Sequence, residues 1–164
     1  DSFAVLLPDD LFFSDISCLS QLIDTYEKTN SSVIAVNKID KENIHKYGVI
    51  NPGIKENNAI LIEDIIEKPN AEHAPSDIAV CGRYIFTSLI FEHLEATNFD
   101  KSGEIQLTDA IKSLINNQNV HARLYDGEKF DCGSKKGFVH ATIALALRDN
   151  SISKDISKII KEII

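Results

Sequence analysis

The sequence has little of several features that would point to particular classes of protein. Only three cysteines occur among its 164 residues, Cys18, Cys81 and Cys132, and none of them forms a C-x-x-C pair. The five histidines show no metal-ligand spacing either, so we expect no structural zinc site. An odd and scattered set of cysteines is typical of reduced thiols, which predicts a cytoplasmic protein.

Positive charge is also scarce in this chain. Its 17 lysines and arginines stand against 25 aspartates and glutamates, which gives a net charge of -8. Recognition of nucleic acid usually needs a basic patch, so this balance argues against a nucleic-acid partner. It does not argue against a phosphorylated substrate, because a local lysine and a bound Mg²⁺ can reverse the sign of charge at a site.

Long apolar runs and linkers are absent from the sequence as well. The apolar runs fall far short of the roughly 20 residues that a membrane-spanning helix needs. No charged segment followed by an apolar one opens the chain, so nothing indicates secretion. Without a repeat or a linker, we expect one α/β domain over residues 1–150 and an amphipathic helix over 151–164. That helix packs either on the core or on a partner subunit.

Short apolar segments predict the strands of that domain. Residues 3–7 and 33–36 each form a brief apolar run, typical of a strand buried on both faces. Between them lies a helical stripe of apolar residues, so the default interpretation is a β-α-β unit with a parallel crossover. From Val49 to Pro69 the pattern changes to strands around an Asn51-Pro52-Gly53 turn and an Asn57-Asn58 turn, which predicts a hairpin-like excursion.

Acidic residues follow two of the expected strands. Asp9 and Asp10 come after the first strand, and Asp131 ends another just before Gly133 and a helix that Ser134 can cap. Ligands of open α/β sheets gather beyond the carboxyl ends of strands. Magnesium binds through one or two carboxylates together with substrate phosphates, so these residues are candidate ligands. The alternative is that each aspartate simply forms a turn or a cap.

Glu67, Lys68 and Pro69 form a third candidate group at the end of a strand. Pro69 restricts the residue before it to extended backbone, which would fix Glu67 and Lys68 at the strand's tip. Lysine can pair with a phosphate, and glutamate can accept hydrogen bonds from sugar hydroxyls. The alternative is a solvated ion pair on a loop. Gly48 and Gly82 each offer backbone N–H groups to a ligand, or only relieve a tight turn.

Taken in order, these segments resemble one family of enzymes. The ordered motifs are LPDD, YGV, EKP, GRY, GEIQLTDA and DCGSKKG, and they span residue 3 to about residue 150. This set closely resembles the bacterial UTP–glucose-1-phosphate uridylyltransferases, also called UDP-glucose pyrophosphorylases. The resemblance implies a nucleotide-diphospho-sugar transferase (Rossmann-like) fold of class α/β, with a mixed, mostly parallel sheet flanked by helices. It also implies the reaction UTP + glucose 1-phosphate ⇌ UDP-glucose + pyrophosphate.

The same resemblance assigns roles to residues at matching positions. It implies that Asp9 and Asp131 hold Mg²⁺, that Lys68 contacts the sugar phosphate, and that Glu67 binds glucose hydroxyls. Gly48 and Gly82 occupy positions that face the sugar. Asp10 is the weaker candidate, because the metal role belongs to the first aspartate of the LPD motif. The family also implies a cytoplasmic homo-oligomer that makes nucleotide sugars.

The sequence departs from the family in one respect. Family members carry a glycine-rich G-x-G-T-R loop that holds UTP, and no such loop occurs in these 164 residues. We therefore expect the chain to correspond to roughly the C-terminal half to two-thirds of an enzyme and to be inactive alone. Two alternatives stay open, a glucose-1-phosphate thymidylyltransferase and a non-catalytic sugar-phosphate-binding or association module.

Overall fold

The computed structural model describes residues 1–101 and 103–163. Their contacts group the chain into two compact units. The first, called here the sheet unit, contains Asp1–Leu6 and Asp15–Asp126. The second, called the helical unit, contains Leu7–Ser14 and Gly127–Ile164. The division at residue 150 that the sequence suggests stays a prediction.

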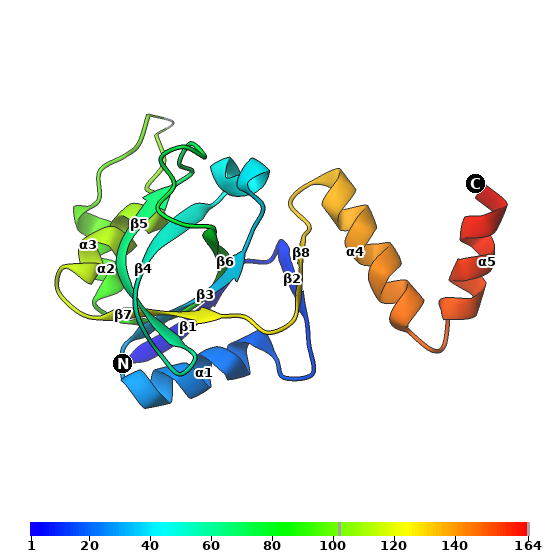
Figure 1. The fold of residues 1–164 in the computed structure, drawn as a ribbon, viewed down its shortest axis with the longest axis horizontal. Helices are drawn as coiled ribbons and strands as arrows, with labels where there is room; N and C mark the ends of the chain where they lie inside the picture. The colour runs from blue at the N-terminus through cyan, green and yellow to red at the C-terminus, as the bar shows by residue number, and fades with distance from the viewer. Residues whose placement is uncertain (102, 164) are drawn as a thin grey trace. The chain divides into compact units, whose positions relative to one another are not determined.

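The described residues of the sheet unit form six strands, three α-helices and one 3₁₀ segment (Figure 1). The strands are β1 (Ser2–Leu6), β3 (Ser32–Lys38), β4 (Gly48–Glu56), β5 (Ala59–Glu67), β6 (Ile78–Thr87) and β7 (Val120–Leu124). The helices are α1 (Cys18–Thr29), α2 (Ile90–Ala96) and α3 (Leu107–Ile115), and the 3₁₀ segment η1 covers Lys41–Lys46.

The six strands form one mixed sheet in the order β1-β6-β3-β7-β5-β4. A mixed sheet flanked by helices confirms the expected fold class. The expectation of a mostly parallel sheet is wrong, because β3–β7 is the one parallel pairing among the described residues. Of the expected β-α-β unit, the parallel direction of β1 and β3 is observed, but the two strands are not neighbours in the sheet. Both β1 and β3 pair antiparallel to β6, so they run parallel to each other with β6 between them.

The first strand differs from its expected burial. In β1 exposed and half-buried residues alternate, whereas residues 32–36 of β3 are all buried. The reason is position, because β1 lies at one end of the strand order and pairs with β6, while β3 lies between β6 and β7. A short apolar run does not distinguish a central strand from an edge strand.

The core lies between the sheet and its helices. Ala110, Ile111 and Leu114 of α3 pack in one buried cluster with alternate residues of β3, Ile34 and Val36. The intervening residues of β3 point to the opposite face, which α1 contacts. Ser17 caps α1 by accepting a hydrogen bond from the Ser20 N–H group at 3.1 Å.

The predicted hairpin is formed by β4 and β5. It turns at Asn57, whose φ of 55° lies in the left-handed region that asparagine tolerates. The Asn51-Pro52-Gly53 segment is not a turn, which corrects the second part of that prediction. It lies inside β4, where the register with β5 shifts. At the open end of the hairpin, Gly48 is the register partner of Glu67.

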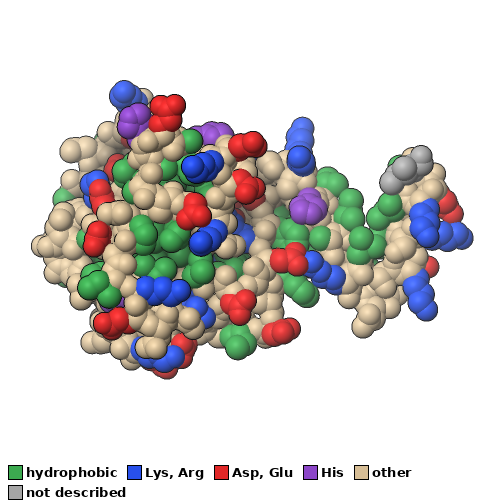
Figure 2. All heavy atoms as spheres, viewed as in Figure 1, with side chains coloured by type: hydrophobic (Ala, Val, Ile, Leu, Met, Phe, Trp, Pro, Cys, Tyr) green, Lys and Arg blue, Asp and Glu red, His purple; other side chains and the backbone are tan. Residues whose placement is uncertain are grey.

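The helical unit has little buried core. It contains the short antiparallel pair β2 (Asp10–Phe13) and β8 (Glu128–Asp131), followed by α4 (Lys135–Arg148) and α5 (Ser153–Ile163). Ser134 caps α4, as expected, by accepting a hydrogen bond from Gly137 N–H at 3.1 Å. Hydrophobic side chains gather over α4 in Figure 2, and Phe138 and Val139 there are more than half exposed. Within the described residues, no helix has the length and apolar character that crossing a membrane requires.

Candidate functional site

The two acidic strand ends meet in the helical unit. Asp10 of β2 is the register partner of Asp131 of β8, and the Cys132 N–H group donates to the Asp9 carbonyl at 2.7 Å. A β-carbon at Gly133 would lie 3.0 Å from Asp9 Oδ2 and 3.3 Å from Asp131 Oδ1. The backbone therefore brings a carboxylate oxygen from each of the two predicted metal ligands to the same side of Gly133.

Local contacts set the carboxylates of Asp131 and of the neighbouring Asp10. The Gly133 N–H group donates to Asp131 Oδ1 at 3.0 Å, which orients that carboxylate. Asp10 instead forms a salt bridge with Lys129 at 2.8 Å, and both side chains are only 13% exposed. This salt bridge engages the Asp10 carboxylate, and the ranking of Asp9 above Asp10 as a metal ligand stays a prediction. We call Asp9, Asp131 and Gly133 the carboxylate pair site.

Two carboxylates are a chemically suitable set for a hard cation. Mg²⁺ prefers oxygen ligands and is commonly held by one or two carboxylates, with waters and substrate phosphates completing its shell. Among the residues that the structure describes, no group of three or more His, Cys, Asp or Glu side chains is placed to hold a metal. The arrangement thus fits a magnesium ion shared with a phosphorylated substrate and does not fit a site built from protein ligands alone.

The second group of candidates lies in the sheet unit, at the open end of the β4–β5 hairpin. Glu67 ends β5, and its carboxylate Oε1 lies 3.3 Å from Lys68 Nζ. Lys68 is also fixed by its backbone, because its N–H group donates to the Tyr47 carbonyl at 3.1 Å. We call Gly48, Glu67 and Lys68, with Thr108 of α3, the hairpin-end group.

The backbone of Lys68 differs from its prediction. Pro69 was expected to hold it extended, yet its φ is 43°, in the left-handed region. A residue other than glycine in this region carries roughly 1–3 kcal/mol of strain, and such residues cluster at functional sites. The hydrogen bond to Tyr47 and the burial of Pro69 hold this conformation against its cost.

Thr108 is a member of this group that the sequence did not single out. Its hydroxyl donates to Glu67 Oε2 at 2.6 Å. A β-carbon at Gly48 would lie 3.1 Å from Thr108 Oγ1 and 3.2 Å from Glu67 Oε2, so the glycine leaves space beside both oxygens. The threonine lies in the GEIQLTDA segment, one of the motifs that resemble the family, and that resemblance assigned it no role.

Gly82, the remaining candidate, lies within β6. Its φ is 57°, and the neighbouring strand β3 shifts its register with β6 between Ile34 and Val36. A left-handed conformation inside a strand favours glycine and marks a bulge. The backbone conformation is therefore sufficient reason for a glycine at position 82. The contact of Gly82 with a sugar stays a prediction.

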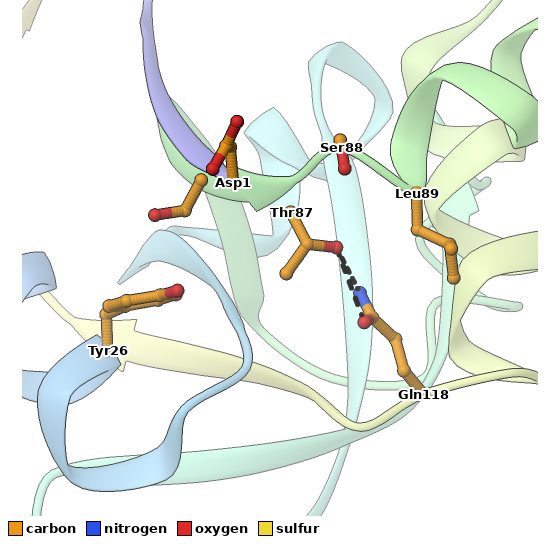
Figure 3. A pocket seen from close by; sticks show the side chains of 7 residues that line it. Asp1, Tyr26, Thr87, Ser88, Leu89 and Gln118 are labelled. Atoms are coloured by element: carbon orange, nitrogen blue, oxygen red, sulfur yellow. Dashed lines mark hydrogen bonds between the residues drawn. The ribbon is translucent and has the colours of Figure 1, made fainter.

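A separate hollow among the described residues of the sheet unit lacks these residues. Figure 3 shows it, lined by Asp1, Ser2, Tyr26, Thr87, Ser88, Leu89 and Gln118. Thr87 and Gln118 hydrogen-bond across it, and Gln118 Nε2 also donates to Ser32 Oγ at 3.0 Å. The residues that line this hollow include none of the predicted ligands.

Comparison with known proteins relates the chain to one family. The sequence profile described as "Nucleotidyl transferase" matches residues 1–147. A UTP–glucose-1-phosphate uridylyltransferase of Staphylococcus epidermidis RP62A is 42% identical over 163 residues, which are 99% of this chain and 57% of that protein. The chain therefore spans little more than half the length of this curated relative.

Solved structures give the same result. One is the crystal structure of a UDP-glucose pyrophosphorylase complexed with UDP-glucose, whose sequence is 40% identical and whose TM-score is 0.84. The match covers 88% of this chain and 56% of the pyrophosphorylase chain. A putative glucose-1-phosphate thymidylyltransferase from Bacillus anthracis is 25% identical and has a TM-score of 0.69. That match covers 91% of this chain and 55% of the thymidylyltransferase chain. The resemblance to uridylyltransferases found in the sequence motifs is confirmed.

Proposed function

Because the chain belongs to the nucleotidyl transferase family, we propose that it forms the sugar-phosphate-binding and metal-binding part of a UTP–glucose-1-phosphate uridylyltransferase. The observation that carries the proposal is the meeting of Asp9 and Asp131 at Gly133, in a chain with 42% identity to such an enzyme. The greater similarity to uridylyltransferases than to the thymidylyltransferase, 40% against 25% identity, favours UTP over dTTP.

The proposed reaction joins a sugar phosphate to a nucleotide. A phosphate oxygen of glucose 1-phosphate attacks the α-phosphorus of UTP, a new P–O bond forms, and the bond to the β-phosphate oxygen breaks as pyrophosphate leaves. Such transfers depend mainly on positioning and on neutralisation of the phosphate charge. The side chains of this chain supply parts of both.

The hairpin-end group would bind the sugar phosphate. Lys68 would place its ammonium against the phosphate of glucose 1-phosphate, lowering the repulsion between two anionic substrates. Glu67 would accept hydrogen bonds from the glucose hydroxyls, which are donors that match a carboxylate. Gly48 and Gly82 would allow the sugar to approach the backbone.

The carboxylate pair site would hold the metal. Asp9 and Asp131 present hard oxygen ligands, and Gly133 leaves the space between them open. A bound Mg²⁺ supplies positive charge next to phosphate oxygens. We further propose that the protein acts in the cytoplasm as a homo-oligomer, with UTP and glucose 1-phosphate as its substrates and neither nucleic acid nor a membrane as a partner.

The direct test measures pyrophosphate release by the full-length protein, meaning this chain with any residues that belong with it. We expect turnover with UTP and glucose 1-phosphate in the presence of Mg²⁺, slower turnover with dTTP, and little or none from the 164 residues alone. Preference for dTTP would replace the uridylyl assignment with the thymidylyl one. Binding of glucose 1-phosphate without turnover by the full-length protein would instead indicate a non-catalytic module.

Lys68→Ala tests the hairpin-end group within that enzyme. Loss of the ammonium should raise the KM for glucose 1-phosphate by about tenfold or more, because a charge-assisted contact to phosphate is worth about 1.5–3 kcal/mol. The KM for UTP should stay within about twofold, which initial-rate measurements at varied concentrations of each substrate would show. Lys112→Ala, which removes a lysine paired with Asp64 at 2.8 Å, is the matched control. An effect confined to UTP would contradict the assignment of Lys68.

A further inference from the structure

We propose that Thr108 is a positioning residue that orients the Glu67 carboxylate for the hydroxyls of the sugar. The inference deepens the proposed function and depends on it. Thr108 is the second residue of α3, whereas Glu67 is the last residue of β5, so two separate elements meet at this contact.

The contact itself is short and charge-assisted. Thr108 Oγ1 lies 2.6 Å from Glu67 Oε2, within the range of about 2.5–2.7 Å that hydroxyl–carboxylate bonds adopt. The other carboxylate oxygen, Oε1, faces Lys68 Nζ at 3.3 Å. With one partner on each oxygen, the plane of the carboxylate is fixed, and each oxygen keeps lone pairs for further donors.

The position of the hydroxyl is set by the core. Helix α3 buries Ala110, Ile111 and Leu114 against the sheet, so its first turn cannot shift without disturbing that packing. Glu67 is held by its strand register with Gly48. A hydroxyl on a packed helix and a carboxylate on a paired strand therefore form a rigid contact, as a binding site requires.

Gly48 leaves room next to this contact. A β-carbon there would come within 3.1–3.2 Å of both oxygens, closer than ordinary van der Waals distance. The space that the glycine leaves is therefore bounded by one acceptor carboxylate and one hydroxyl, which can accept a hydrogen bond after donating its own. Two neighbouring oxygen acceptors match the hydroxyl groups of a hexose.

The hydroxyl also limits the pairing between Glu67 and Lys68. Lys68 is proposed to bind the sugar phosphate, so a carboxylate that turned fully toward its ammonium would compete with that phosphate. The bond from Thr108 retains Oε2 on the side of α3, which leaves the two charged groups in separate roles. Thr108 thereby supports sugar binding through Glu67 and phosphate binding through Lys68.

Three substitutions in the full-length protein test the inference. Thr108→Val keeps the branched shape without the hydroxyl, Thr108→Ser keeps the hydroxyl, and Thr97→Val is the control because its hydroxyl bonds to the His93 carbonyl at 2.7 Å. We expect Thr108→Val to weaken binding of glucose 1-phosphate about tenfold by calorimetry, with kcat lowered less and the KM for UTP unchanged. Thr108→Ser and Thr97→Val should each bind within about twofold of the unsubstituted protein.

A double substitution separates positioning from a general effect on the fold. If Thr108 acts through the carboxylate, Thr108→Val should cause little further loss in protein that already carries Glu67→Gln. An equal tenfold loss in both backgrounds would overturn the inference, as would full binding by Thr108→Val. A Thr108→Ser protein that binds about tenfold more weakly than the unsubstituted protein would overturn it too, and this comparison decides the matter if the valine variant does not fold. If the unsubstituted protein binds no glucose 1-phosphate, the proposed function fails first.

Discussion

The two units of the chain hold their candidate residues in different ways. In the sheet unit, large side chains such as Phe86, Ile111 and Leu114 are buried, and the hairpin-end group is attached to that core. In the helical unit, Phe130 and Ala141 are the described apolar residues that reach full burial, while four apolar residues of α4 are at least 40% exposed. Packing therefore positions one group, whereas short local bonds position the other.

The local bonds of the helical unit are few but specific. The Cys132 N–H group donates to the Asp9 carbonyl, and the Gly133 N–H group donates to the Asp131 carboxylate. Lys129 pairs with Asp10 nearby. Arg148 adds two hydrogen bonds to Glu128 and lies over the ring of Phe13 at 4.9 Å. Such contacts set side-chain direction, but each contributes only about 1 kcal/mol or less when exposed.

The largest expected effect tests the carboxylate pair site. Asp131→Asn in the full-length protein should lower kcat by about 100-fold, because a neutral amide is a poor ligand for Mg²⁺ and the site has few other ligands. Steady-state rates at increasing Mg²⁺ concentration measure this. The exposed side chain of Asp126 gives the control, Asp126→Asn. Unchanged kinetics at saturating Mg²⁺ would remove Asp131 from the site.

A second prediction contrasts two glycines beside Asp131. At Gly137, in the first turn of α4, an added β-carbon would overlap the Asp131 backbone carbonyl. Helix propensity alone predicts that Gly137→Ala stabilises the protein by about 1 kcal/mol, whereas overlap predicts destabilisation by about 2 kcal/mol. We expect the overlap to outweigh the helix propensity, so that Gly137→Ala lowers the free energy of unfolding. Urea unfolding, monitored by helix content, measures this change.

Gly133→Ala is the counterpart of that substitution. Its β-carbon would meet carboxylate oxygens of Asp9 and Asp131 rather than backbone, so the fold should tolerate it. Mg²⁺ affinity should fall by about tenfold, as is typical when the surroundings of metal ligands change. Titration with Mg²⁺ followed by calorimetry would show it. A Gly137→Ala protein of undiminished stability would contradict the close approach of Gly137 to the Asp131 carbonyl. Undiminished Mg²⁺ binding by Gly133→Ala would contradict the placement of Gly133 at the metal site.

The smallest expected effect compares cysteines of the two units. Burial raises the pKa of the Cys18 thiol to about 11, an effect that Arg83 and Arg123 oppose. Cys18 and Cys81 are buried, whereas Cys132 is half-buried. At pH 8 a thiol reagent should therefore modify Cys132 first, with Cys18 and Cys81 reacting only after unfolding. Mass spectrometry of partially modified protein gives the order, and Cys132→Ser should abolish the early reaction.

The raised pKa of Cys18 also has a consequence for stability. Between pH 9 and about 11 the unfolded chain loses the Cys18 proton while the folded protein retains it, so the unfolding free energy contributed by this group decreases as pH rises. Cys18→Ala should reduce that decline. An identical pH dependence in the variant would show that other groups account for it.

Local patterns predicted many of the elements well. Ser134 caps α4 as expected, and the Asn57 turn joins β4 to β5, because caps and turns depend on a few neighbouring residues. The Asn51-Pro52-Gly53 segment failed as a turn because its pairing with β5 overrides the local preference. Lys68 failed in the same way, since its bond to Tyr47 outweighs the restriction from Pro69.

Residue patterns were enough to identify the family, the residue types of the candidate site and the approximate order of helices and strands. The folded chain was needed to see that β6 lies between β1 and β3, that Asp9 and Asp131 meet at Gly133, and that Thr108 bonds to Glu67. The physical reason is separation along the chain. Thr108 and Glu67 are 41 residues apart, and no local preference specifies a contact that depends on how a helix packs against a strand.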